Sequence, residues 1–186
     1  MQKLFFLLLI SCSLNISAQV KYPQLDKSPL DISYYPVNYP VLKIQDKVAD
    51  PLIARVVYSR PEKNGRIIFG DLIGYGKVWR LGANEATEIE FFQNVTINNV
   101  KVRKGRYTLF AIPQENSWTM IINRDTDTWG SFKYDEKKDV LRVQVPVSKI
   151  TEPNEFLSMI FSKIDASKIA LNVSWDDVQA TLPISF

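Results

Sequence analysis

The chain has 186 residues with 23 basic and 20 acidic side chains, a formal net charge of +3, no histidine and a single cysteine. The lack of histidine excludes Ser-His-Asp and Cys-His catalytic systems and metal centres built on histidine ligands. The near balance of charge, without a dense basic run, excludes the pattern of nucleic-acid-binding proteins. We expect one domain, no cofactor and no nucleic-acid partner.

The first 18 residues have the pattern of a secretory signal peptide. Lys3 supplies the positive charge, residues 4–10 form a short apolar run, and Ala18 is a small residue suited to the cleavage site. A second interpretation is that residues 9–12 form a lipobox, with a lipid anchor on Cys12. We therefore expect a secreted or periplasmic protein, with an outer-envelope lipoprotein as the alternative. No apolar run is long enough for a transmembrane helix.

Residues 19–46 are rich in proline and tyrosine. Repeated proline disfavours a regular helix or a central strand, so we predict an extended N-terminal arm. The arm either lies across the domain with its tyrosines as anchors or serves as a flexible linker. The residues concerned are Pro23, Pro29, Pro36 and Pro40 with Tyr22, Tyr34, Tyr35 and Tyr39.

Residues 47–186 have an all-β pattern, because short apolar and β-branched runs alternate with Asn, Gly, Asp and Pro. We predict a single antiparallel β-sandwich, jelly-roll-like, with at most one short helix at residues 69–78, where three glycines weaken the helical pattern. Asn98-Asn99 and Asp176-Asp177 are predicted hairpin turns. The expected strands are residues 52–59, 87–92, 95–97, 100–102, 106–112, 117–123, 140–145, 156–164, 169–175 and 178–184.

Residues 60–87, RPEKNGRIIFGDLIGYGKVWRLGANEAT, combine arginines, aromatic rings and acids with repeated glycine. This mixture favours a shaped loop that binds a ligand, with arginine forks for polar groups and aromatic faces for stacking. The alternative is a scaffold in which Arg80 and Glu85 form a buried ion pair and Asn84 caps the backbone. The candidate ligand-binding residues are Arg60, Tyr75, Trp79, Arg80, Asn84 and Glu85.

Residues 125–136 come close to the spacing of a calcium-binding EF-hand loop. Asp125, Asp127, Gly130 and Glu136 stand at its positions 1, 3, 6 and 12, but Trp129 occupies a ligand position and the flanking segments are predicted strands. We therefore expect no metal site. Trp129 and Tyr134 are a secondary candidate, an aromatic shelf for a sugar ring; alternatively they pack on the sheet.

Three blocks of the chain, residues 60–87, residues 104–113 (KGRYTLFAIP) and residues 129–143 (WGSFKYDEKKDVLRV), resemble the family designated domain of unknown function 2911. The resemblance extends from about Pro29 to the C-terminus and implies a secreted, β-rich bacterial protein. It implies no activity, cofactor or substrate.

Three hypotheses of function follow. The leading one is a non-enzymatic domain that binds a small polar ligand, a glycan or an envelope component. The second is a hydrolase or lyase with Glu85 and Asp71 as acid and base. The third is a structural or assembly module, in which the polar residues only hold the loop.

Overall fold

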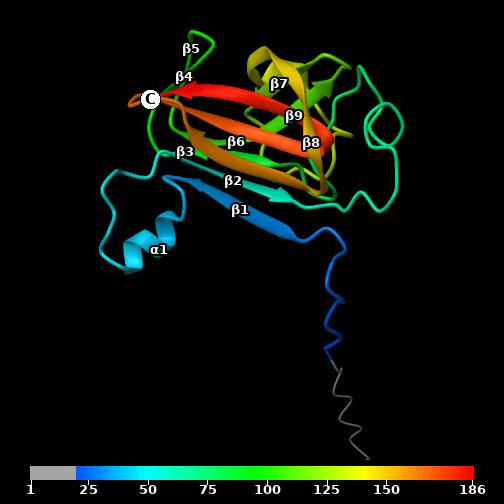
Figure 1. Cartoon of the computed structure of the whole chain (residues 1–186), viewed down its shortest axis with the longest axis horizontal. Coiled ribbons are helices and arrows are strands. Elements are labelled where there is room, and N and C mark those ends of the chain that lie inside the picture. Colours follow the sequence, from blue (N-terminus) through cyan, green and yellow to red (C-terminus); the bar gives the residue numbers. More distant parts are fainter. Residues whose placement is uncertain (1–19) are drawn as a thin grey trace, which may run out of the picture.

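The computed structural model describes residues 20–186, so the predicted signal peptide and the lipid-anchor alternative at Cys12 lie outside the described residues. The elements are β1 (Leu30–Tyr35), α1 (Tyr39–Ile44), β2 (Ala54–Ser59), β3 (Glu88–Phe91), β4 (Val95–Ile97), β5 (Val100–Val102), β6 (Gly105–Pro113), β7 (Ser117–Asn123), the 3-10 helix η1 (Glu136–Lys138), β8 (Asp139–Lys163) and β9 (Lys168–Ser185). The loop of residues 60–78 and the helix α1 lie at opposite ends of the molecule (Figure 1).

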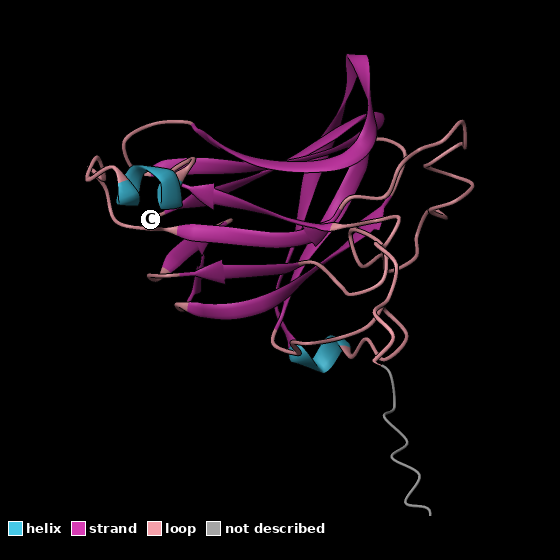
Figure 2. Ribbon diagram, turned by 90° about the horizontal axis from the view of Figure 1, so that it is seen from below, coloured by secondary structure: helices cyan, strands magenta, loops and turns pink. Residues whose placement is uncertain are grey.

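The strands form one antiparallel sheet in the order β1-β2-β3-β6-β7-β8-β9-β4-β5. The 25-residue strand β8 joins its two parts, because its first part pairs with β7 and its later part pairs with β9. That later part also lies beside β1, where the Ser33 hydroxyl donates a hydrogen bond to the Met159 carbonyl. The sheet therefore curves round a common interior (Figure 2). The predicted all-β fold is confirmed.

The interior is filled by aromatic and branched side chains from both parts of the sheet. Trp118 on β7 and Trp175 on β9 are each 1% exposed. Trp79, from the loop before β3, packs edge-on against Trp118 at 5.7 Å between ring centroids and stacks on Trp175 at 6.3 Å. A side chain outside the strands therefore completes the core.

Strands β6 and β7 are covered on both faces. Residues 108–111 of β6 and residues 120–123 of β7 are all buried, whereas a strand with one solvated face alternates. On the outer face, Phe110 and Ile121 pack with Ala86 and the partly buried Tyr134. Ala86, from the segment before β3, and Tyr134, from the loop of residues 124–135, thus cover the outside of the sheet.

The predicted helix at residues 69–78 is wrong. Gly70 and Gly76 have φ values of +93° and +74°, a conformation that ends a helix, and the segment forms turns. The helix α1 lies instead in the proline-rich arm, where Pro40 occupies the first turn and needs no N–H partner. The arm also contains β1, which pairs with β2. No helix within residues 20–186 has the length and apolar character required to span a membrane.

Of the two predicted hairpin turns, the structure contains the one at Asn98-Asn99 and lacks the one at Asp176-Asp177. Asn98 and Asn99 have φ values of 47° and 63° and join β4 to β5, which confirms that hairpin. The turn at Asp176-Asp177 is wrong, because β9 continues through both residues. Asp176 does adopt a positive φ of 55°, opposite a register shift in β8. The residue thus bends a strand instead of ending it.

Candidate functional site

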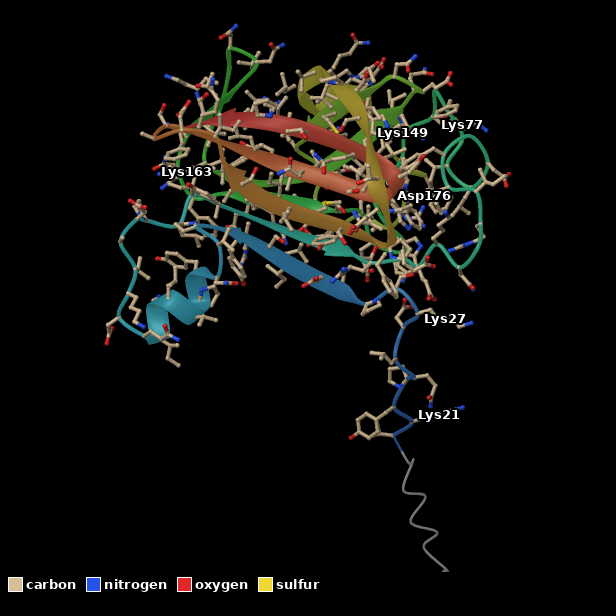
Figure 3. The ribbon with its side chains drawn as sticks, in the orientation of Figure 1. Lys21, Lys27, Lys77, Lys149, Lys163 and Asp176 are labelled. Carbon is tan, nitrogen blue, oxygen red and sulfur yellow. The ribbon has the colours of Figure 1, made fainter. Side chains whose placement is uncertain are left out.

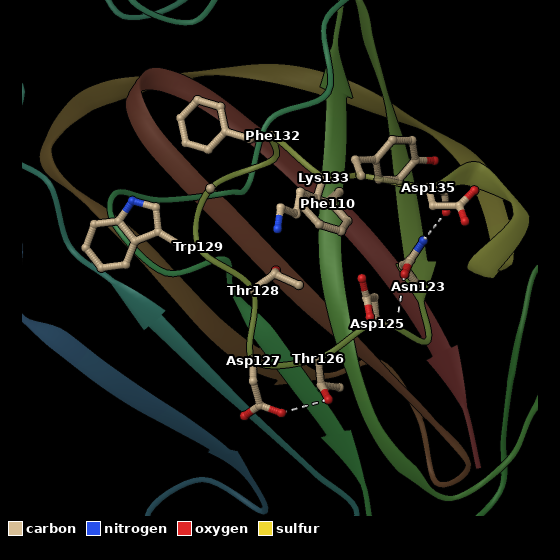
Figure 4. Close-up of a pocket in the computed structure, with 12 residues that line it drawn as sticks. Phe110, Asn123, Asp125, Thr126, Asp127, Thr128, Trp129, Phe132, Lys133 and Asp135 are labelled. Atoms are coloured by element: carbon tan, nitrogen blue, oxygen red, sulfur yellow. Dashed lines mark hydrogen bonds between the residues drawn. The ribbon is translucent and has the colours of Figure 1, made fainter.

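A hollow of about 470 Å³ lies on the outer face of the sheet, within the loop of residues 124–135 (Figure 4). Two aromatic side chains of this loop project into solvent, since Trp129 is 61% exposed and Phe132 is 86% exposed. The residues that line the hollow are Phe110, Asn123, Asp125, Thr126, Asp127, Thr128, Trp129, Gly130, Phe132, Lys133, Tyr134 and Asp135.

Backbone hydrogen bonds fix the rim of the hollow to the segment that precedes β3. The Ala86 N–H donates to the Thr128 carbonyl at 3.0 Å, and the Gly130 N–H donates to the Asn84 carbonyl at 2.9 Å. Glu85 and Trp129 are therefore opposite each other in a short antiparallel bridge. The fold thus brings Asn84 and Glu85, candidates from one sequence block, beside Trp129 from another.

The acidic residues with calcium-like spacing are paired with three different cations. Asp125 lies 2.9 Å from the Lys138 ammonium, and Asp127 lies 2.6 Å from the Arg106 guanidinium. Glu136 lies 3.6 Å from Arg142. Within residues 20–186, no cluster of three or more acidic, cysteine or histidine residues suits a metal ion.

A hydrogen-bonded network centred on Asp139 supports the base of the hollow. The Asp139 carboxylate accepts hydrogen bonds from Asn123 Nδ2 at 2.7 Å, from the Tyr134 hydroxyl at 2.6 Å and from Arg142 Nε at 2.7 Å. Burial, together with the bond to Asp139, raises the pKa of Tyr134 to about 12, so its hydroxyl stays a donor. The ring of Tyr134 packs edge-on against Phe110, with 5.2 Å between centroids.

Asn123 and Asp139 were not among the candidates predicted from the sequence. Asn123 is a polar side chain at the end of the apolar strand β7, and it is 1% exposed. A polar residue that ends a buried strand needs a partner, and this requirement is the signal that could have identified it. Nothing in the sequence indicates that the partner is Asp139.

A second hollow, of about 310 Å³, lies on the other side of Trp129. It shares the wall formed by residues 127–129 with the first hollow. Its remaining lining comes from the outer face of β1 to β3 and the segment before β3, namely Leu30, Val57, Glu85, Ala86 and Glu88. Trp129 therefore stands between two depressions.

Arg60, predicted to bind a ligand, holds the fold together. Its guanidinium contacts Asp31 at 3.1 Å, the Leu157 carbonyl at 3.3 Å and the Ser158 hydroxyl at 3.0 Å. These contacts tie the end of β2 to β1 and β8, and they engage all three nitrogens of the side chain. The guanidinium of Arg60 thus makes its hydrogen bonds within the protein.

Two aromatic candidates lie outside the two hollows beside Trp129. Trp79 is 5% exposed and belongs to the core, so it offers no stacking face to a ligand. Tyr75 is 42% exposed, lies on Gly70 in the loop of residues 60–78 and lines a separate hollow of about 280 Å³. Neither side chain lines the depressions beside Trp129.

The alternative interpretation, a buried ion pair between Arg80 and Glu85, is wrong. Glu85 is exposed, and no ion pair within 4.0 Å joins the two side chains. Arg80 is half-buried, its Nε atom has no hydrogen-bond partner within residues 20–186, and burial lowers the pKa of its guanidinium. Glu85 follows Asn84, whose φ of 59° belongs to the turn onto the surface. Glu85 therefore faces the second hollow.

Asp71, the proposed partner of Glu85 in catalysis, is exposed in the turn of residues 69–73 and lines neither hollow. Near this loop, two aspartates at the bend of β9 form ion pairs with lysines from other segments. Lys63 contacts Asp176 at 2.6 Å, and Lys149 on β8 contacts Asp177 at 2.7 Å. Figure 3 labels Asp176 and Lys149 at this end of the sheet. These pairs brace the end of the sheet.

The fold and this site define an all-β domain with an aromatic-rimmed hollow on the outside of its sheet. Residues 40–184 match the family described as Protein of unknown function (DUF2911), and the chain belongs to this family. The family resemblance expected from the sequence is thereby confirmed. No curated protein and no solved structure matches the chain.

Proposed function

We propose that this protein is a non-enzymatic binding domain for carbohydrate, in which a sugar ring rests against Trp129 in the hollow of residues 124–135. The observation that carries the proposal is the 61% exposure of the Trp129 side chain at the rim of this hollow. Tryptophan is usually highly buried, and an exposed apolar surface beside a cavity is typical of a binding site.

The chemistry of the lining supports a sugar. A pyranose ring has an apolar C–H face and a rim of hydroxyl groups. Trp129 and Phe132 offer apolar faces, while Asp125, Asp127 and Lys133 offer acceptors and donors for hydroxyl groups. Asp125 and Asp127 are held by Lys138 and Arg106, so these acceptors are already positioned before a ligand arrives.

The placement of the carboxyl groups favours binding over catalysis. Hydrolysis of a glycosidic bond requires two carboxyl groups that face one cleft, one that donates a proton and a second that acts as base or nucleophile. Asp71 and Glu85, the pair considered from the sequence, do not line a common hollow.

Replacement of Trp129 by alanine is expected to weaken carbohydrate binding by at least about tenfold. The aromatic contact contributes about 0.5–1.5 kcal/mol, the lost burial of apolar area adds to this, and about 1.4 kcal/mol corresponds to tenfold. Binding is measured by isothermal titration calorimetry with the sugars identified on a glycan array. The matched control is Tyr75→Ala, which removes an aromatic ring of 42% exposure from a separate hollow that Trp129 does not line. Equal affinity in the wild type and Trp129→Ala would refute the site.

We also propose that the domain acts outside the cytoplasm, on the basis of Lys3, the apolar residues 4–10 and Ala18. Expression in a bacterial host with the full N-terminus is expected to give a secreted or periplasmic form that begins at Gln19. Intact-mass spectrometry of that form is the measurement. A diacylated species that begins at Cys12 would instead establish the outer-envelope lipoprotein.

A further inference from the structure

Trp129 separates two hollows of about 470 Å³ and about 310 Å³. Both volumes fall in the range of about 300–1,000 Å³ that small-molecule ligands occupy. The segment of residues 127–129 lines both hollows and so forms a wall that they share. Figure 4 shows Trp129 on one side of this segment and the Phe110–Asp125 side of the first hollow on the other. A ligand that fills both hollows therefore crosses the segment of residues 127–129, where Trp129 offers an exposed aromatic face.

The two hollows also offer the same kind of chemistry. The first combines Trp129 and Phe132 with carboxylates, and the second combines Leu30 and Val57 with Glu85 and Glu88. An apolar surface beside hydrogen-bond acceptors thus occurs twice. A ligand made of repeating units, each with an apolar face and hydroxyl groups, satisfies both hollows with the same groups.

The charges around the hollows select against an anionic ligand. The lining carboxylates are Asp125, Asp127, Asp135, Glu85 and Glu88. The cations that line the hollows or pair with these acids are Lys133, Lys138 and Arg106. Acidic groups are therefore in excess, and a negatively charged ligand would be repelled.

We propose that the natural ligand is a linear chain of neutral sugar units that fills both hollows and crosses Trp129. This inference rests on the proposed function and adds the form and charge of the ligand. Once one unit is bound, the next unit is held close to its own hollow, so its binding has a high effective concentration. Affinity should therefore rise with the number of units until both hollows are filled.

The test is titration calorimetry with neutral cello-, malto-, manno- and N-acetylchito-oligosaccharides of one to four units, beside oligogalacturonates of the same lengths. For the best neutral series, we expect three or four units to bind at least about tenfold more tightly than one unit. The oligogalacturonates are expected to bind more weakly than the best neutral series of equal length.

The matched variant is Val57→Tyr, which fills the second hollow from a partly buried position on β2 and keeps a residue type suited to strands. It should abolish the gain with length and leave the affinity for a single unit unchanged, with a melting temperature that confirms folding. Affinity independent of length, or a length dependence unchanged in Val57→Tyr, overturns the inference and leaves the proposed function standing. Tighter binding of oligogalacturonates also overturns the inference. Failure of every neutral sugar to bind overturns both.

Discussion

Replacement of Trp79 by alanine is expected to lower the free energy of unfolding by about 3–5 kcal/mol, the usual cost of removing a large aromatic side chain from a core. Trp79 is 5% exposed and contacts Phe69, Trp118 and Trp175, with centroid distances between 5.7 and 6.3 Å. Its indole N–H also faces the Gly82 carbonyl. The contacts come from both parts of the sheet, so surrounding side chains cannot close the cavity easily.

Urea-induced unfolding, followed by circular dichroism, measures this loss. Trp129→Ala is the matched control, because it makes the same substitution at a residue that is 61% exposed. Its effect should stay within about 0.5 kcal/mol, as for most surface substitutions. Equal stability of the two variants would show that Trp79 does not complete the core.

Replacement of Asp139 by alanine is expected to lower the free energy of unfolding by about 3 kcal/mol, at the lower end of the cost of breaking a buried charge pair. The Asp139 side chain is only 10% exposed, whereas that of Arg142 is 40% exposed and can recover some contact with water. Asn123 and the Tyr134 hydroxyl would lose an acceptor while they remain largely covered.

A second acidic residue that contacts Arg142 provides the control for Asp139. Glu136 also contacts Arg142, but at 3.6 Å and with a side chain that is 76% exposed. Glu136→Ala should therefore cost less than about 1 kcal/mol, as for exposed ion pairs. Urea unfolding of both variants tests the difference. Similar losses in the two variants would mean that the network around Asp139 adds no more than a surface contact.

Local backbone preference explains which turns could be predicted. Asn98 and Asn99 tolerate positive φ, and two such residues between short apolar runs suffice for a hairpin. Asp176 shows the same preference, with a φ of 55°, yet the chain around it continues as β9. There, pairing with the long strand β8 decides the outcome. Such pairing depends on distant residues and cannot be inferred from the local sequence.

The candidate site was predicted in part for the same reason. Trp129 and Tyr134 were predicted either to form an aromatic shelf or to pack on the sheet, and the sequence could not decide between these. In the fold Trp129 is 61% exposed, whereas Tyr134 packs against Phe110. The role of Arg60 was missed because its partners Leu157 and Ser158 lie 97 and 98 residues away in the chain. An arginine in a loop offers the same fork to a ligand or to the protein, and only the fold decides between them.

In the loop of residues 124–135, the groups that hold the loop in place differ from the side chains that are free to contact a ligand. Main-chain atoms of Thr128 and Gly130 and the network around Asp139 hold the loop, while Trp129, Phe132 and Lys133 remain exposed. Exposed side chains can change at little cost to stability. Substitutions at these rim positions should thus change the ligand that is bound without changing the fold. Related chains are therefore expected to differ at the rim before they differ at Asn123 or Asp139.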